Sequence, residues 1–96
     1  MLHILNASPS RPAFEQCLRY LRNGDALLLC GSAVYGAIVG SQAAERLQTC
    51  GAHVYVLASD ASACGIKNQL AEGLILADYT DFVALSAHFK NSQSWY

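Results

Sequence analysis

The sequence predicts an α/β fold: a single three-layer α/β/α domain over residues 1–96, with a mainly parallel sheet of about four to five strands. Short apolar runs alternate with segments of helical periodicity, and the connections between them are short. Residues 26–30 are apolar without alternation, which is typical of a strand buried on both faces of a parallel sheet. No linker, repeat or low-complexity tract divides the chain, so we expect one domain.

Residues that typically begin and end secondary structure mark the first strand and the first helix. Residues 2–6 are an apolar run, ended by the segment 7–10. A helix should follow, with Ser10 as its N-cap, Pro12 in its first turn and Asn23-Gly24 as its stop. Its apolar side chains recur at i, i+3, i+4 and i+7, on one helical face: Phe14, Cys17, Leu18 and Leu21.

The middle of the chain continues the alternation. After the strand at residues 26–30, residues 33–37 are expected to form a helical turn. Ser41 is a candidate cap for a second helix, which should carry Ala44 and Leu47 inward and end at Gly51. Residues 53–58 predict a third strand.

The last third predicts one more strand–helix pair and a short final element. Residues 59–65 form a polar turn with some helical character, and residues 74–77 predict a fourth strand. Asp78 should open a helix that carries Phe82, Leu85 and Phe89 on one face. The chain then ends on Trp95 and Tyr96, which predicts a last short strand or a docked interface, because two aromatics are poorly hidden on a frayed tail. The order of the strands cannot be read from the sequence.

The composition is unusually apolar for a chain of this size. Hydrophobic residues make up 53% and charged residues only 14%, against roughly 25% charged in an average globular protein. A domain this small has too little interior for so many apolar side chains. We therefore expect an apolar face to be covered by another subunit.

Charge and hydropathy exclude several classes of function. The net charge is −1 and the six Lys and Arg residues are scattered, so direct binding to nucleic acid is not expected. The N-terminal segment lacks a positive region and a long apolar run, and no stretch is long enough to cross a bilayer. We expect a cytoplasmic protein with reduced thiols and no membrane contact.

Four cysteines are the most informative chemical feature. They are Cys17, Cys30, Cys50 and Cys64. None forms a C-x-x-C pair, and no histidine completes a common zinc signature, so we expect no metal and no organic cofactor. Three readings remain: buried small hydrophobes, disulfides, or single thiols that react one at a time.

Several segments together resemble a known family, the small TusB/DsrH-type subunits of bacterial sulfur-relay complexes. In chain order they are Leu2-His3-Ile4-Leu5 with Ser8-Pro9, Cys17-Leu18-Arg19, Gly24-Asp25 with Leu27-Leu28-Leu29, Ala33-Val34-Tyr35, Val54-Tyr55-Val56-Leu57 with Asp60, Asp78-Tyr79-Thr80-Asp81-Phe82-Val83, and Gln93-Ser94-Trp95. No segment is specific alone, but the ordered set covers essentially the whole chain.

The resemblance implies an assembly and a pathway. Family members are one of three related small subunits that form a dimer of heterotrimers, which receives persulfide sulfur from an upstream carrier and passes it to a downstream one. In one branch the sulfur ends as 2-thiouridine at the wobble position of tRNA, and in the other it serves dissimilatory sulfur oxidation. The best-established sulfur carrier is a cysteine of a sister subunit. Some members carry a cysteine in the first helix, aligned with Cys17.

Two cysteines are candidates for sulfur chemistry. A relay thiol must be accessible and is helped by a depressed pKa. Cys17 has the support of the family, but it lies on the apolar helix face beyond the first turn, where the helix dipole helps little. Cys30 ends a buried strand at the carboxyl edge of the sheet, where ligand crevices form, and the Gly31-Ser32 turn could offer amides to an anionic sulfur. For both, packing as a buried small residue is the competing reading.

The other candidates are weaker. Cys50 is assigned to structure, because the C-terminus of a helix disfavours a thiolate. Cys64 lies in an exposed turn without an evident activating group. The remaining polar residues favour structural roles: the separated histidines His3, His53 and His88, the helix-capping carboxylates Asp78 and Asp81, and the turn serines Ser8, Ser10 and Ser32, which complete no phosphate-binding fingerprint.

The leading hypothesis is a non-catalytic or accessory subunit of a sulfurtransferase complex that acts in tRNA 2-thiolation. Apolar surface and the Trp95-Tyr96 tail are the expected contacts with sister subunits. The alternatives are a DsrH-like subunit of a sulfur-oxidation relay and, from another class, a free-standing α/β module that binds a small anion or nucleotide at the carboxyl edge.

Overall fold

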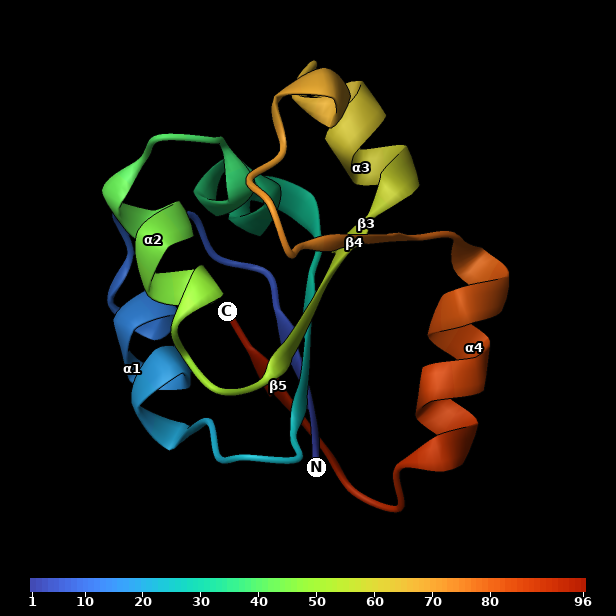
Figure 1. Cartoon of the computed structure of the whole chain (residues 1–96). Coiled ribbons are helices and arrows are strands. Elements are labelled where there is room, and N and C mark those ends of the chain that lie inside the picture. Colours follow the sequence, from blue (N-terminus) through green and yellow to red (C-terminus); the bar gives the residue numbers. More distant parts are fainter.

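A computed structural model describes residues 1–96 as alternating strands and helices (Figure 1). The strands are β1 (Leu2–Leu5), β2 (Ala26–Leu29), β3 (His53–Leu57), β4 (Ile75–Ala77) and β5 (Ser92–Trp95). The α-helices are α1 (Pro12–Tyr20), α2 (Gln42–Gln48), α3 (Ala58–Ala63) and α4 (Tyr79–His88), and two 3₁₀ helices are η1 (Gly31–Ala37) and η2 (Lys67–Gln69).

The five strands form one sheet in the order β4-β3-β2-β1-β5, and every neighbouring pair is parallel. The predicted α/β class with a parallel sheet is confirmed. The last strand is the short element expected at the C-terminus, and it pairs with β1 so that Trp95 lies opposite Leu5. The first and last strands are therefore neighbours, although they lie at the two ends of the chain.

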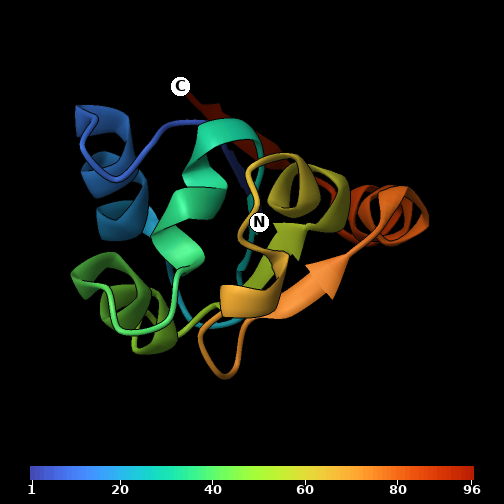
Figure 2. The ribbon, with the colours of Figure 1, turned by 90° about the horizontal axis from the view of Figure 1, so that it is seen from above.

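The two faces of the sheet are covered unequally. On one face α1, η1, α2 and α3 enclose a core of fifteen buried residues, among them Phe14, Leu29 and Val56. On the other face the core has only four buried residues, and the side chains packed against them include Phe82 and Leu85 of α4 and Phe89, which directly follows this helix. Figures 1 and 2 show α4 alone on its side of the sheet.

Most local predictions agree with the structure. The Ser41 hydroxyl accepts a hydrogen bond from the Ala44 amide at 3.1 Å and caps α2. Asp78 and Asp81 form a reciprocal capping box at the start of α4, so both carboxylates are structural, as expected. The predicted helical turn is present as η1, and residues 26–29 are buried on both faces.

The prediction for the two ends of the first helix was wrong. Arg11 is the N-cap of α1 and makes no side-chain capping bond, while the Ser10 hydroxyl pairs with that of Ser8 at 3.0 Å. The helix ends at Tyr20, before Asn23-Gly24, because the chain turns toward Asp25, whose carboxylate accepts the Arg22 amide. No helix of the chain is long and apolar enough to cross a membrane.

Candidate functional site

Cys17 lies in the core between α1 and the sheet. Its side chain is fully buried, as its place on the apolar helix face requires. Burial, with a smaller contribution from Cys50, raises the pKa of the Cys17 thiol to about 12. In the isolated chain this thiol is neutral, and a persulfide on another protein cannot reach it. Sulfur transfer through Cys17 therefore requires the core to open.

Cys30 follows β2 at the carboxyl edge and is half-buried. Its thiol is 3.6 Å from the Leu5 carbonyl oxygen, to which it donates. Burial raises the pKa of Cys30, and the nearby Asp60 carboxylate raises it further. The Gly31 amide that sequence reasoning offered to an anionic sulfur instead donates to Asp60 at 2.7 Å. The surroundings of Cys30 therefore favour the thiol over the thiolate.

The other two cysteines lie at helix C-termini, where the helix dipole disfavours a thiolate. The Cys50 thiol follows α2 and donates to the Leu47 carbonyl at 3.1 Å. Cys64 is the C-cap of α3, and its contact with the Tyr35 hydroxyl raises the pKa of Tyr35. The four cysteines thus lie on four different segments, and no cation acts on the pKa of the two relay candidates, Cys17 and Cys30.

A polar network joins the first and last strands around His3. The His3 ring is 2% exposed, and its Nε2 is 3.0 Å from an Asp25 carboxylate oxygen. Its Nδ1 accepts a hydrogen bond from the Trp95 indole at 3.2 Å. The other Asp25 oxygen is 3.0 Å from the Met1 amino group. Burial acts to raise the pKa of Asp25, but hydrogen bonds from the Met1 amine, the Arg22 amide and His3 outweigh it and lower the pKa.

The terminal aromatics have different surroundings. Trp95 is partly buried against the larger core, and its ring lies 5.3 Å from that of Tyr20 and 6.2 Å from that of His3. Tyr96 is 75% exposed. Of the other predicted residues, His53, His88 and Ser32 are exposed. Sequence reasoning missed the contact between His3 and Trp95, since 92 positions separate them.

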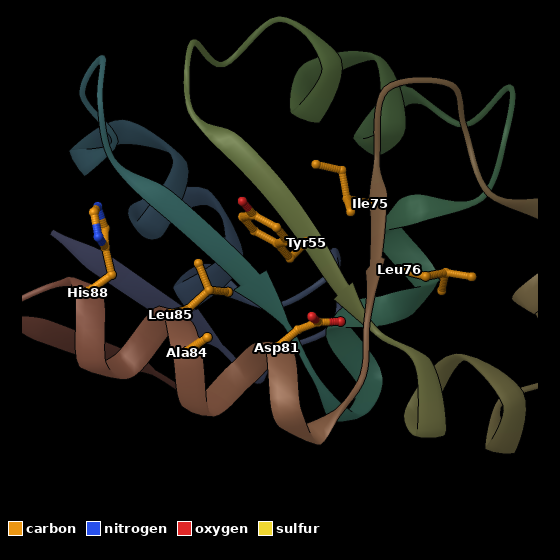
Figure 3. Close-up of a pocket in the computed structure, with 7 residues that line it drawn as sticks. All are labelled: Tyr55, Ile75, Leu76, Asp81, Ala84, Leu85 and His88. Carbon is orange, nitrogen blue, oxygen red and sulfur yellow. The ribbon is translucent and has the colours of Figure 1, made fainter.

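An apolar groove of about 510 Å³ lies beside α4 on the sparsely covered face (Figure 3). The strands contribute Tyr55, Ile75 and Leu76, and α4 contributes a row along its length: Asp81, Ala84, Leu85 and His88. Ile75 is 46% exposed, which is high for an apolar strand residue. The composition signalled that such a face exists, and the groove locates it.

The comparisons with known proteins agree along the whole chain. A family described as "DsrH like protein" matches residues 7–92. The chain is 39% identical to Protein TusB of Escherichia coli K12 and to that of Salmonella enteritidis PT4, over 99% of this chain and 100% of each relative. The fold is similar to the crystal structure of the ychN protein from E. coli, with a TM-score of 0.75 at 14% identity, covering 97% of both chains.

Proposed function

This chain belongs to the DsrH-like family that includes the TusB proteins, and from that premise we propose that it is an accessory subunit of a sulfur-relay complex that supports 2-thiolation of the wobble uridine of tRNA. The observation that carries the proposal is the 39% identity to TusB over 99% of this chain and 100% of the relative. We place the complex in the cytoplasm.

The environments of the thiols support an accessory role. Relay chemistry needs an exposed thiolate. Both relay candidates, Cys17 and Cys30, have raised pKa values, and Cys17 is fully buried. The chain is better suited to hold a sister subunit's cysteine in position than to carry sulfur itself.

Direct transfer, where it occurs, is assigned to Cys17. Its thiolate would attack the outer sulfur of a donor persulfide, which forms a Cys17 persulfide and releases the donor as a thiol. The intact mass would rise by one sulfur atom, and this gain should vanish in Cys17→Ser. A gain of one sulfur that survives Cys17→Ser removes Cys17 from the proposal, and Cys30→Ser then tests the second candidate.

The proposed partners are two related sister subunits in a dimer of heterotrimers, with upstream and downstream persulfide carriers. The Trp95-Tyr96 tail is one proposed contact, because Tyr96 is 75% exposed and continues an edge strand. Co-expression with the sister subunits followed by size exclusion tests this assembly. Elution of the chain apart from both sisters would contradict it.

The decisive experiment is tRNA analysis in a strain that lacks this chain. The 2-thiouridine content at the wobble position should fall to the background level and return when the chain is supplied on a plasmid. Complementation by Cys17→Ser would show that thiolation does not require sulfur on Cys17, and complementation by the Cys17→Ser/Cys30→Ser double variant would show that it requires neither candidate. Unchanged thiolation in the deletion strain contradicts the proposal.

A second candidate is a sulfur-oxidation relay, favoured by the DsrH description of the matching family. It makes the opposite prediction for the same strain: wobble thiolation stays normal, while growth on reduced sulfur compounds is lost.

A further inference from the structure

His3 is a buried imidazole with both ring nitrogens engaged. The ring is 2% exposed. Its Nδ1 accepts a hydrogen bond from the Trp95 indole at 3.2 Å, and its Nε2 is 3.0 Å from a carboxylate oxygen of Asp25. An indole N–H can only donate, so this arrangement requires Nδ1 to carry no proton. The neutral imidazole therefore satisfies both contacts at once.

Protonation of His3 would affect its two contacts in opposite ways. A proton on Nδ1 would point at the indole N–H of Trp95, and two donors cannot form a hydrogen bond. On the other side of the ring, the Asp25 carboxylate would form an ion pair with the imidazolium. The fold can therefore hold the charged ring through Asp25 if the Trp95 indole moves away. Protonation thus favours a local rearrangement over unfolding of the whole domain.

The groups that surround His3 leave this conflict in place. A cavity of about 420 Å³ beside the ring is lined by four further residues: Met1, Tyr20, Arg22 and Asp25. The Met1 amine and the Arg22 guanidinium oppose a charge on His3, whereas Asp25 favours it. The positions paired with His3 on the two neighbouring strands carry no charge: Leu27 and Gln93. None of these groups offers the Trp95 indole an acceptor in place of Nδ1.

Trp95 is the side chain that holds β5 to the domain. β5 is an edge strand, and its other three residues are exposed. The Trp95 ring packs against the larger core and lies 5.3 Å from the ring of Tyr20. The Trp95 carbonyl accepts the Asn6 amide at 2.8 Å. Edge segments with few buried side chains open at a low cost in free energy, so loss of the indole contact should loosen β5.

We propose that protonation of His3 releases Trp95 and, with it, the edge strand β5, so that the C-terminal end of the chain is a pH-sensitive switch. At neutral pH the indole is docked and β5 completes the sheet. In acid the ion pair between His3 and Asp25 remains, while Trp95 and Tyr96 leave the edge of β1. The inference does not depend on the proposed sulfur relay, because it concerns contacts within one chain.

The first test is the fluorescence of Trp95, the only tryptophan in the chain. Between pH 8 and pH 5 we expect its emission to shift to the red and its quenching by acrylamide to rise at least about twofold, while the far-UV circular dichroism persists. His3→Gln should abolish this transition, because a neutral amide cannot gain the proton. The matched control is His53→Gln combined with His88→Gln, which changes two exposed histidines and should keep the transition.

The second test locates the opening by hydrogen exchange. The Asn6 amide donates to Trp95 on the β5 side of β1, and the Cys30 amide donates to the Leu5 carbonyl on the β2 side, at 3.0 Å. Between pH 8 and pH 5 the protection factor of the Asn6 amide should fall at least about tenfold, and that of the Cys30 amide should stay unchanged.

Three results would overturn the inference. They are a fluorescence transition that is absent or coincides with the loss of circular dichroism, a transition that persists in folded His3→Gln, and equal loss of protection at Asn6 and Cys30. If His3→Gln does not fold, an NMR titration of the wild-type chain decides. The His3 ring and the Trp95 indole N–H should then titrate with one common midpoint, and separate midpoints overturn the inference. Wobble thiolation in the deletion strain tests the proposed function independently of these results.

Discussion

The indole N–H of Trp95 donates to Nδ1 of His3 at 3.2 Å, and this contact determines the tautomer of the imidazole. Because Nδ1 accepts, the ring proton of neutral His3 is on Nε2, which donates to Asp25 at 3.0 Å. One buried ring thus links the edge strand β5 to the turn before β2. The three side chains form a chain of donors and acceptors with no unsatisfied buried atom.

Trp95→Phe is expected to destabilise the fold by about 1–3 kcal/mol, because it leaves the buried Nδ1 of His3 without a donor. Urea unfolding followed by circular dichroism measures the loss. Tyr96→Phe is the matched control and should change stability by less than about 0.5 kcal/mol, since Tyr96 is exposed. Equal stability of Trp95→Phe and wild type would mean that the contact contributes nothing.

Asp25→Asn should destabilise the protein at pH 7 and flatten its response to acid. The pKa of Asp25 is lowered in the folded state, so the folded state binds fewer protons than the unfolded state. The ionised Asp25 carboxylate therefore stabilises the fold at pH values above the pKa of an ordinary carboxyl group. This stabilisation is lost as the pH falls below about 4. The difference in unfolding free energy between wild type and Asp25→Asn, about 1–3 kcal/mol at pH 7, should therefore shrink toward zero in acid. A difference that grows in acid contradicts the assignment.

The sequence predicted β1 to β4 well because each contains a short apolar run, which is typical of strands in a parallel sheet. It did not predict their order, which depends on long-range pairing such as that of Leu5 with Trp95. The order has a large consequence. With β4 and β5 at opposite edges, α4 must cross one face alone, while α1, η1, α2 and α3 share the other. Composition indicated an uncovered face, but only this topology shows where it lies.

The surroundings of the candidate thiols, Cys17 and Cys30, were predicted only in part. The burial of Cys17 follows from the periodicity of α1. The hydrogen bond of the Gly31 amide could not be predicted from local sequence, because its acceptor, Asp60, lies 29 residues further along the chain. For the same reason the sequence could not reveal that a carboxylate lies beside Cys30.

Alkylation of the native chain should leave Cys17 unmodified for longest. The half-buried Cys30, Cys50 and Cys64 should react with iodoacetamide at pH 8 before Cys17, whose thiol is buried and has a pKa of about 12. Peptide mass spectrometry gives the order of labelling. In 6 M guanidinium chloride the four rates should converge, and that sample serves as the control. Early labelling of Cys17 in the native chain would show that the core opens readily.

Gly36→Ala should destabilise the fold by about 1–3 kcal/mol through overpacking. A methyl group at position 36 would lie 2.8 Å from Cζ of Phe14 and 3.3 Å from Cγ of Pro9. Phe14 is 1% exposed and cannot move aside without disturbing the core between α1 and η1. Thermal unfolding should show a lower Tm.

A double-mutant cycle tests whether this clash is the cause. Phe14→Leu removes the ring atoms that the methyl group would meet, so Gly36→Ala should cost less in the Phe14→Leu background than in the wild type, with a coupling of at least about 0.5 kcal/mol. Additive effects of the two changes would show that the clash with Phe14 is not what makes glycine necessary at position 36.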